Sequence, residues 1–569
     1  MPNKPAQIPF PLSSFPGLNP QESSGRLVNC YAEPLGEPQR PTGPSMQIWR
    51  GCPGLSQHAI TAQAGYRGGL LVKNLSYEVF KDTAATVDAA GVVNVLGAFP
   101  GSQQVSIARN LAANPDVVAV DIDNGAYKLS TGGAPTSYNG AGSLPQPNSV
   151  CFQDGYFFFT IGDSRCFASA LNALTQNALT FITVQGRADV QLLRGIPFSN
   201  MLLLFTTGSF EAWQDQAIAA PAFPYGRLTI VDVGLVQPSA IAGFEVGFAE
   251  LLWVSQDYHV QWMSPGSLAP NDVSPPDLNR LIERAVRAGQ ILEAGCTIAG
   301  GKKFWRISSP DWTWELNLST KRWHERWSLN GGVYGRSRMV AGHPAFSKWI
   351  VGDVQSGNLL YPDNDSYTEN GDPFLFRIES GPVREFPNAT RIARADFDFV
   401  TGVGQEVGNY VMTVLGAASG AGGVVRLTVD QTSKADTGDQ VNVAGVTGTT
   451  EANGPHPILV VDANHIELTD VLFQNAYVSG GTATDISSPP EAIDPQCAIS
   501  CSKDGGISFD NPSLRSLAPQ ARGELARASV KNRGFAGPHG VRWRLDITDP
   551  VYRGLKGGIM SDNPQVVGP

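Results

Sequence analysis

The feature of this 569-residue chain that most constrains its fold is a hairpin phrase that recurs seven times. Each copy is an apolar run, a polar turn and a second apolar or aromatic run. The copies are LLV-KNLS-YEVF from Leu70, VVAVDI-DNG-AYKL from Val117, YFFFT-IGDSR-CFA from Tyr156, LLLF-TTGS-FEAW from Leu202, LLWVS-QD-YHVQW from Leu251, KKFWRI-SSPD-WTWELNL from Lys302 and KWIV-GDVQSG-NLLY from Lys348. Their starts are separated by 47, 39, 46, 49, 51 and 46 residues. Because hairpins that return every 40–50 residues or so are typical of propeller blades, the repeat predicts an all-β fold built on a β-propeller of about seven blades.

Composition narrows the classes of function open to such a chain. Charged residues make up 16% of it, below the usual level of about 25%, and the formal net charge is −10. Phosphate binding needs clustered Lys and Arg, so this balance argues against a basic clamp on nucleic acid. A conduit through which DNA slides without sticking is compatible with it.

The cysteine and hydropathy patterns bear on the compartment. The chain has seven cysteines and no CxxC pair, and Cys497 and Cys501 would lie roughly 13 Å apart on one strand, too far for a disulfide. We therefore expect synthesis in a reducing cytoplasm, with most thiols acting as small core residues. The opening MPNKPAQIPFPLSS lacks the apolar stretch of a signal peptide, and no apolar run is long enough to predict a membrane-spanning segment.

The first two segments of the chain differ in composition. Residues 1–66 are Pro-rich, and Pro at this density favours extended backbone and opposes pairing inside a sheet. Their apolar residues, including Phe10 and Trp49, are too many for a solvated tail, so we predict an extended N-terminal arm packed against its own ring or a neighbouring subunit. Residues 67–404 carry the repeats and are predicted to form the propeller. Helical spacing of apolar residues predicts one short helix within Asp277–Glu293, on a blade connection.

The remaining two segments are also β-rich. In 405–487 aromatic residues become scarce and β-branched alternation rises, which predicts a small β domain inserted in a loop of the ring. Residues 488–569 return to propeller-like strands, such as Val541–Ile547. We expect them to complete the propeller.

One short motif has both a structural and a catalytic interpretation. Ser502, Asp504, Gly506 and Phe509 fit the Asp-box pattern S-x-D-x-G-x-S/T-W/F. In propellers this box is a turn in which Asp caps backbone N–H groups, Gly takes a special φ and the aromatic ring packs inward. Sialidases carry several such boxes, but the box is structural even there. We therefore interpret it as a structural turn.

Motifs that would carry chemistry are missing from the sequence. None of HExxH, GxxxxGK[ST], a GxGxxG after a strand, or a GxSxG elbow occurs. The sequence therefore predicts no catalytic residues, no cofactor and no metal, and a protein that is not an enzyme.

Four stretches, taken in their order, resemble the tail hub or nozzle proteins of short-tailed bacteriophages, also called packaged-DNA stabilisation proteins. They are SGRLVNCYAE from Ser24 with PGL from Pro53; GSFEAW from Gly208 with GLVQPS from Gly234 and LWVSQD from Leu252; GDVQSGNLLY from Gly352; and SKDGG from Ser502 with RG from Arg533 and RWRL from Arg542. The first is similar to the family's opening RLVNxYxE, and within it Arg26, Asn29 and Tyr31 are the candidates for packing the arm. The stretch at 405–487 falls outside the family's pattern.

The resemblance implies a structural virion protein, made in the host cytoplasm and located in the phage tail. It implies a ring of six copies, docked below the portal and adaptor, that retains packaged DNA and forms the conduit for its ejection. The implied partners are other copies of the chain, the portal and adaptor proteins, tail fibre or spike proteins, and genomic DNA that passes through the lumen without sequence recognition.

Two other classes of function stay open. A sialidase-like carbohydrate-active tail propeller predicts a pocket on the propeller axis with clustered Arg and a pair of carboxylates. A monomeric protein-binding propeller predicts a single copy in solution and no association with the virion.

Overall fold

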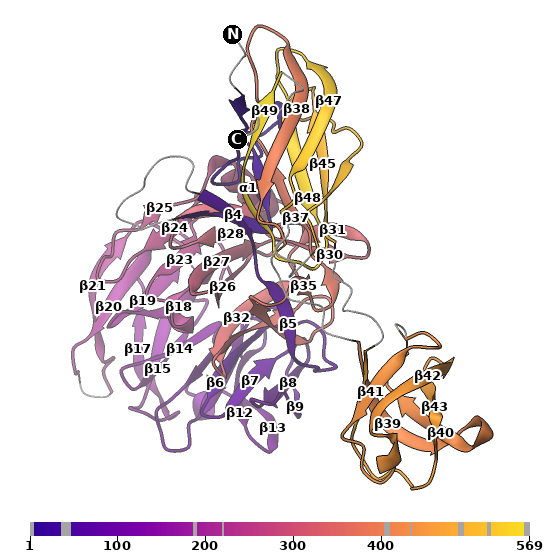
Figure 1. The fold of residues 1–569 in the computed structure, drawn as a ribbon. Helices are drawn as coiled ribbons and strands as arrows, with labels where there is room; N and C mark the ends of the chain where they lie inside the picture. Colours follow the sequence, from indigo (N-terminus) through magenta and orange to yellow (C-terminus); the bar gives the residue numbers. More distant parts are fainter. Residues whose placement is uncertain are drawn as a thin grey trace. The chain divides into compact units, whose positions relative to one another are not determined.

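The computed structural model of the chain describes residues 5–35, 47–185, 191–218, 221–402, 410–432, 435–486, 494–519 and 525–562. The chain forms two compact units: unit 1 contains Met1–Phe399, Gln496–Arg515 and Arg527–Pro569, and unit 2 contains Val400–Pro495 and Ser516–Ala526. Strands dominate both units (Figure 1). None of the helices in the described ranges is long and apolar enough to cross a membrane.

Unit 1 contains seven antiparallel sheets arranged as the blades of a propeller (Figure 1). Blades 1–3 are β6 (Gly68–Val72), β7 (Leu75–Val79), β8 (Thr83–Val87) and β9 (Val93–Ala98); β10 (Ser106–Arg109), β11 (Val117–Asp121), β12 (Gly125–Ser130) and β13 (Gly133–Tyr138); and β14 (Ser149–Gln153), β15 (Tyr156–Thr160), β16 (Arg165–Ser169) and β17 (Gln176–Thr183). Blades 4 and 5 are β18 (Leu192–Phe198), β19 (Met201–Thr206), β20 (Phe210–Asp215) and β21 (Tyr225–Val231); and β22 (Ile241–Ala242), β23 (Leu251–Val254), β24 (Val260–Met263) and β25 (Asn271–Asp272). Blade 6 begins with β26 (Glu293–Ala299), β27 (Lys302–Ser308), β28 (Thr313–Asn317) and β29 (Arg322–Glu325), and blade 7 with β32 (Met339–Ala345), β33 (Lys348–Asp353) and β34 (Leu359–Asp363).

The innermost strands close a ring around one axis. Strands β6, β10, β14 and β18 lie side by side in that order, β22 lies beside β26, β26 beside β32, and β32 returns to β6. Between blades 4 and 5 the contact runs through the 3-10 turn η3 (Phe244–Val246), which packs on β18. The predicted propeller is confirmed, with seven blades.

Each of the seven repeated phrases lies in a different blade. The phrase from Leu70 covers the first two strands of blade 1, and the other six cover the second and third strands of blades 2–7. Middle strands are buried on both faces, which is why runs such as Val117–Asp121 are continuous and not alternating. The sequence period therefore reports the buried centre of each blade.

The ring is closed by the N-terminal arm. Strand β5 (Gly54–Ala59) pairs antiparallel with β34 of blade 7, with Ala59 opposite Leu359. Strands β35 (Thr368–Glu369) and β36 (Asp372–Pro373) extend this blade to six strands. The expectation that residues 488–569 complete the propeller needs correction: β5 closes the ring, while three C-terminal strands lengthen the sheet of blade 6. An alternating pattern fits any half-buried strand and does not specify its partner.

Blade 6 continues into a nine-stranded sheet. Beyond β29 the order is β2 (Arg26–Val28), β37 (Phe376–Glu379), β48 (Arg542–Ile547), β45 (Gln496–Ser502) and β46 (Ser513–Ser516). A six-stranded sheet contains β3 (Cys30–Pro34), β4 (Gln47–Gly51), β49 (Gly554–Ser561), β38 (Thr390–Phe399) and β47 (Ala528–Ala536), with β1 (Ala6–Gln7) paired to β49. Phe397 of β38 packs on Trp543 of β48 with ring centres 5.5 Å apart, so the C-terminal strands belong to two facing sheets. A separate hairpin is formed by β30 (Trp327–Asn330) and β31 (Val333–Arg336).

The arm is built into the fold instead of lying along it. Strand β2 is an interior strand, parallel to β29 and antiparallel to β37. Our expectation that Pro content opposes interior pairing is wrong for this part, because β2 falls in a proline-free stretch between Pro20 and Pro34. Residues 1–4 and 36–46 of the predicted arm lie outside the described residues.

Apolar clusters fill the spaces between blades. Separate clusters join blades 1 and 2, 2 and 3, 3 and 4, and 7 and 1, and a large one joins blades 4–7. The predicted helix is present as α1 (Pro276–Arg287), on the connection between blades 5 and 6. Pro276 occupies its first turn, where its missing N–H costs nothing, and Leu278, Ile282 and Ala285 are buried. The other short turns are η1 (Pro20–Glu22), η2 (Gly140–Gly142), η4 (Ala421–Gly423) and η5 (Thr450–Ala452).

Unit 2 contains a closed six-stranded barrel. The strand order is β39 (Val411–Ser419), β40 (Val424–Val429), β43 (His465–Leu472), β42 (Gly454–Asp462), β41 (Gln440–Ala444) and β44 (Thr482–Asp485). Burial alternates along β40 and β41, so one face of each strand fills the barrel. The chain enters unit 2 after β38 and returns at β45. These are strands of the two facing sheets, so the insertion is not in a loop of the ring as predicted.

Candidate functional site

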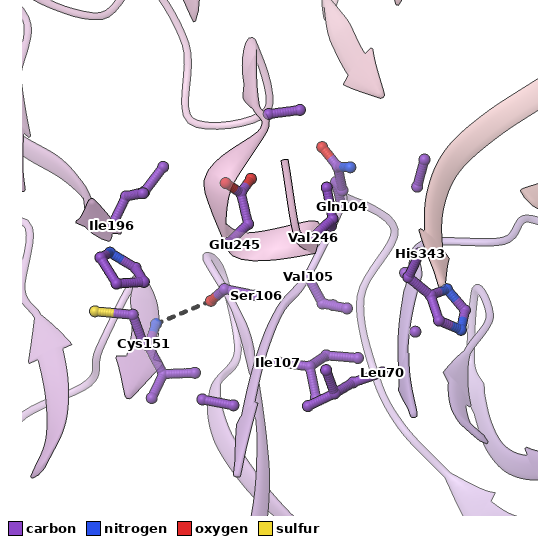
Figure 2. Close-up of a pocket in the computed structure, with 18 of the residues that line it drawn as sticks. Leu70, Gln104, Val105, Ser106, Ile107, Cys151, Ile196, Glu245, Val246 and His343 are labelled. Atoms are coloured by element: carbon purple, nitrogen blue, oxygen red, sulfur yellow. Dashed lines mark hydrogen bonds between the residues drawn. The ribbon is translucent and has the colours of Figure 1, made fainter. Parts of the chain in front are cut away.

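A cavity of about 540 Å³ lies on the propeller axis, and all seven innermost strands contribute residues to its wall. Figure 2 shows part of this wall. Small residues let the strands converge there. A Cβ on Gly295 would lie 2.7 Å from the Ala341 carbonyl oxygen, and one on Gly342, where φ is +148°, would lie 2.5 Å from that of Cys296. Glycine therefore permits direct backbone contact between blades 6 and 7.

Most of the lining residues labelled in Figure 2 are apolar, and Glu245 is the single acidic residue among them. Glu245 of η3 places Oε1 3.9 Å from Nη2 of Arg194, while its Oε2 has no hydrogen-bond partner. Burial raises the pKa of Glu245, and the nearby Arg194 opposes that shift. Arg194 also donates from Nη1 to the Pro238 carbonyl oxygen at 2.8 Å.

The cavity does not have the arrangement expected of a sialidase. Among its described lining residues Glu245 is the single carboxylate, and the two arginines are Arg109 and Arg194. Burial raises the pKa of the Cys151 thiol to about 12 and that of Cys296 well above its usual range, so both thiols are protonated and poor nucleophiles. The described lining of this cavity therefore lacks the carboxylate pair that glycoside hydrolysis uses.

The cavity is also too small to be a DNA channel. A volume of about 540 Å³ is typical of a small-molecule pocket, and the backbones of blades 6 and 7 are in direct contact beside it. Any conduit for duplex DNA must be formed outside the propeller axis.

Arg26, the first of the three predicted arm residues, lies at the joint between the arm and blade 6. Its guanidinium pairs with Glu325 of β29 through two hydrogen bonds of 2.6 Å and lies 4.7 Å from the ring centre of Trp327. Glu325 is buried, and it also accepts a hydrogen bond from Ser14 Oγ. A bidentate pair of this kind fixes orientation as well as distance.

Asn29 holds the turn between β2 and β3. It is fully buried with φ of +54°, and its Nδ2 donates to the carbonyl oxygens of Trp327 and Leu375 at 2.8 and 2.7 Å. Its Oδ1 accepts from Trp327 N at 2.8 Å. Asn tolerates this left-handed conformation and its amide replaces missing backbone partners, so one residue satisfies both needs.

Tyr31 packs over a buried charged cluster. Its ring centre lies 5.5 Å from Phe304 and 6.0 Å from His324. Nε2 of His324 is 3.4 Å from Cys52 Sγ and 2.9 Å from Glu315 Oε2. Arg26, Asn29 and Tyr31, the three predicted arm residues, thus all pack against other parts of the same chain.

Cys52, Glu315 and His324 are of metal-ligating types, but their contacts are those of a hydrogen-bonded ion pair. Burial alone would lower the pKa of His324. The interactions with Cys52 and Glu315 are stronger than this effect and raise the pKa to about 9. One ligand atom of each of the three residues lies within 4.8 Å of the others. Neither this cluster nor its buried position was foreseen, because Cys52 and His324 are far apart in the sequence.

The Asp-box residues form the turn that follows β45. Ser502 Oγ donates to Asp504 Oδ1 at 2.6 Å and accepts from Gly506 N at 2.8 Å, and Ser508 N donates to both Asp504 oxygens at 3.0 Å. Burial would raise the pKa of Asp504, but these hydrogen bonds hold it well below its usual range. Phe509 is half-buried, with the Arg544 guanidinium carbon 3.7 Å from its ring centre. The carboxylate is thus engaged by its own turn.

Two further buried ion pairs escaped sequence reasoning. Arg338 Nη2 lies 2.7 Å from Asp353 Oδ2, and Arg326 Nη2 lies 3.2 Å from Glu369 Oε1. Asp353 belongs to the GDVQSG turn of the last repeat, so its position in a turn was visible in the sequence. Its partner, Arg338, could not be identified from the sequence.

Comparison with solved structures finds other propellers at low similarity. The WD40 β-propeller domain of Doa1 has a TM-score of 0.35 and 11% identity, and covers 54% of this chain and 96% of that one. The β-propeller domain of Myceliophteria thermophila Cps50 (Swd1) has a TM-score of 0.37 and 10% identity, and covers 54% and 99%. Neither adds to the fold established by strand pairing. No curated protein sequence matches the chain.

A family comparison is decisive. The sequence profile described as "Bacteriophage P22 Gp10, beta-propeller" matches residues 22–367, which is more than half of the chain. The matched range begins before Arg26 and ends after β34, so it contains strand β2, the closing strand β5 and strands β6–β34 of the seven blades. The chain belongs to this family of phage stabilisation proteins.

Proposed function

We propose that the protein is a ring subunit in the tail of a short-tailed phage, docked below the portal and adaptor. In this role it retains packaged DNA and bounds the conduit through which DNA is ejected. The observation that carries the proposal is a phage-family propeller whose own axis is closed to DNA. A conduit then has to be enclosed by several copies, and we propose six.

The physical properties of the chain suit this task. Heterologous contacts repeated around an axis close into a ring, and propeller blades give each subunit stiffness through paired strands with few exposed edges. A net charge of −10 favours passage of DNA without binding to it or reading its sequence. Tail fibre or spike proteins are further partners that an outer face of such a ring would hold.

The proposed role is structural, without catalysis. The axial cavity has a wall of mainly apolar and small residues, a single described carboxylate and protonated thiols. The Asp-box carboxylate is occupied by its own turn. Both features favour a structural protein over the sialidase-like alternative.

The experiment is to measure the mass of the purified full chain, alone and mixed with portal and adaptor, and to image the mixture by negative stain. We expect a six-copy ring bound to the adaptor. A monomer that fails to join the adaptor would support the protein-binding alternative and overturn the proposal. Incubation with host glycans tests the sialidase-like alternative, because release of sugar would identify the protein as an enzyme.

A further inference from the structure

A second cavity, of about 260 Å³, lies where three distant parts of unit 1 meet. Its wall includes Arg50 of β4, Lys302 of β27 and Arg553 of the segment before β49. The cavity is therefore built by tertiary structure from the arm, blade 6 and the C-terminal strands.

The charge of this wall is opposite to that of the chain. Among the described lining residues Glu33 is the single carboxylate, and both Arg50 and Lys302 pair with it. Three cationic groups against one carboxylate leave a surplus of two positive charges, in a chain whose net charge is −10.

Arg553 is the cation with the least compensation. Its side chain is almost fully buried, with 3% of the residue exposed. Its Nη2 donates to two carbonyl oxygens, of Tyr367 at 2.9 Å and Asp549 at 2.8 Å, while its Nε has no hydrogen-bond acceptor. Burial lowers the pKa of this guanidinium to about 10. The charges of Asp549 and Glu369 favour this cation, and its guanidinium carbon lies 5.3 Å from the Phe374 ring centre, but its hydrogen bonds go to neutral carbonyls. A buried cation of this kind is stabilised further by an anion in direct contact with it.

Two tyrosines add donors to the same wall. Burial raises the pKa of both Tyr367 and Tyr552, so each hydroxyl keeps its proton at neutral pH. The Tyr552 hydroxyl accepts from Arg50 Nη1, which leaves its proton available to another acceptor. The residues that line this one cavity carry guanidinium, ammonium and hydroxyl groups. Donors of these kinds match the oxygens of a phosphate group.

We propose that this cavity is a binding site for a phosphate group, carried either by inorganic phosphate or by a small phosphate monoester. Arg553 and Lys302 supply the charge, and Tyr367 and Tyr552 donate hydrogen bonds. Because the wall joins β4, β27 and the entry to β49, a bound phosphate ties the arm and the C-terminal strands to blade 6. The inference does not depend on the proposed role in the tail.

Calorimetric titration of the purified full chain tests the site. Inorganic phosphate and glycerol 3-phosphate are titrated separately at ionic strength matched with NaCl, into the wild type, Arg553→Met and Lys302→Met. Arg391→Met is the matched control, because Arg391 is an exposed arginine of β38 outside the cavity. Saturable binding of either titrant to the wild type and the control supports the proposal, and the tighter titrant identifies the source of the phosphate.

The variants give the site a distinctive pattern. Arg553→Met and Lys302→Met are expected to weaken binding at least tenfold, and Glu33→Gln to strengthen it several-fold by removing the competing carboxylate. Saturating phosphate should raise the melting temperature of the wild type by about 2–4 °C. Should Arg553→Met fail to fold, Lys302→Met and Glu33→Gln still decide the matter. No saturable binding of either titrant, or equal affinity in the wild type and Lys302→Met, would overturn the proposal.

Discussion

Two regions of the propeller differ in the contacts that stabilise them: blades 2–5, and a closure region. We define the closure region as blades 6, 7 and 1 with the arm strands β2 and β5. Both regions are built from antiparallel blades. Blades 2–5 are made of consecutive strands, and the spaces between them contain apolar clusters. Five ion pairs in the described residues have both partners almost fully buried, and every one involves the closure region. They are Arg67–Asp121, Glu78–His343, His324–Glu315, Arg326–Glu369 and Arg338–Asp353.

The difference follows from how far apart the paired strands are in the chain. Consecutive strands find each other through a short turn, so apolar contacts, which have no preferred direction, are enough. Strands β2 and β5 have to find partners about 300 residues away. Among the five buried pairs, Glu78–His343 joins blades 1 and 7, and Arg326–Glu369 joins the end of blade 6 to blade 7. A buried charge left without its partner is costly, so these two pairs penalise a wrong arrangement of the blades at the closure.

Deleting residues 1–59 tests the closure region most severely. The deletion removes β1–β5, including the strand that closes blade 7, so we expect loss of a cooperative thermal transition by circular dichroism. Co-expression of a separate peptide of residues 1–66 should restore the transition. A truncated chain that melts like the full chain would contradict the role of β5.

Arg338→Met should destabilise the closure region by about 3–5 kcal/mol, because it leaves the buried carboxylate of Asp353 without its cation. Burial alone would raise the pKa of Asp353, but the hydrogen bonds from Arg338, Ser356 and the Gln355 N–H, together with the charge of Arg338, lower it. Denaturant unfolding measures the change. The control Arg391→Met, on an exposed residue, should stay within about 0.5 kcal/mol of the wild type. A decrease in the free energy of unfolding of less than about 1 kcal/mol would show that the Arg338–Asp353 pair contributes little to stability.

Leu204→Ala should cost about 2–4 kcal/mol in blade 4, because Leu204 is fully buried in the cluster between blades 3 and 4. Leu228→Ala, on the outer strand with 48% exposure, serves as the control and should change little. The same unfolding experiment measures both. Equal effects of the two variants would show that the inter-blade cluster is not the source of stability.

The pH dependence of stability separates the two regions further. The folded pKa of His324, about 9, lies above its ordinary value of 6.5. The stability from this cluster is therefore complete below about pH 6.5 and is lost as pH rises through about 9, by an amount on the order of 1–3 kcal/mol. Denaturant unfolding at pH 6, 7.5 and 9.5 should show this loss in the wild type and in Leu204→Ala. His324→Gln should lack it, and an unchanged slope in that variant would assign the loss to other groups.

The smallest effect is expected for Asp504→Ala in the Asp-box turn. The substitution removes hydrogen bonds to Ser502 and Ser508 in a partly exposed turn, so we expect a loss of about 1 kcal/mol. Thermal unfolding measures it, with Asp504→Asn retaining part of the stability. Abolished sugar release in an otherwise stable variant would instead reveal a catalytic carboxylate.

The sequence predicted well what depends on local pattern. The apolar runs of the seven phrases mark the buried middle of each blade, and the spacing of Leu278, Ile282 and Ala285 marks α1. The Asp-box residues likewise form a local turn whose partners lie within four residues. In each case the residues that make the contact are close in the chain, so their order is enough to specify it.

The sequence alone determined an all-β chain with seven hairpin units and a phage-family arm, because periodicity and turn residues act over a few positions. Only the tertiary structure decided that β5 closes the ring, that the C-terminal strands join two facing sheets, and that Arg50, Lys302 and Arg553 share one cavity. The physical reason is that alternation makes a strand competent to pair but leaves its partner unspecified. The choice among partners is made by long-range packing and by buried charges that are satisfied in a single arrangement.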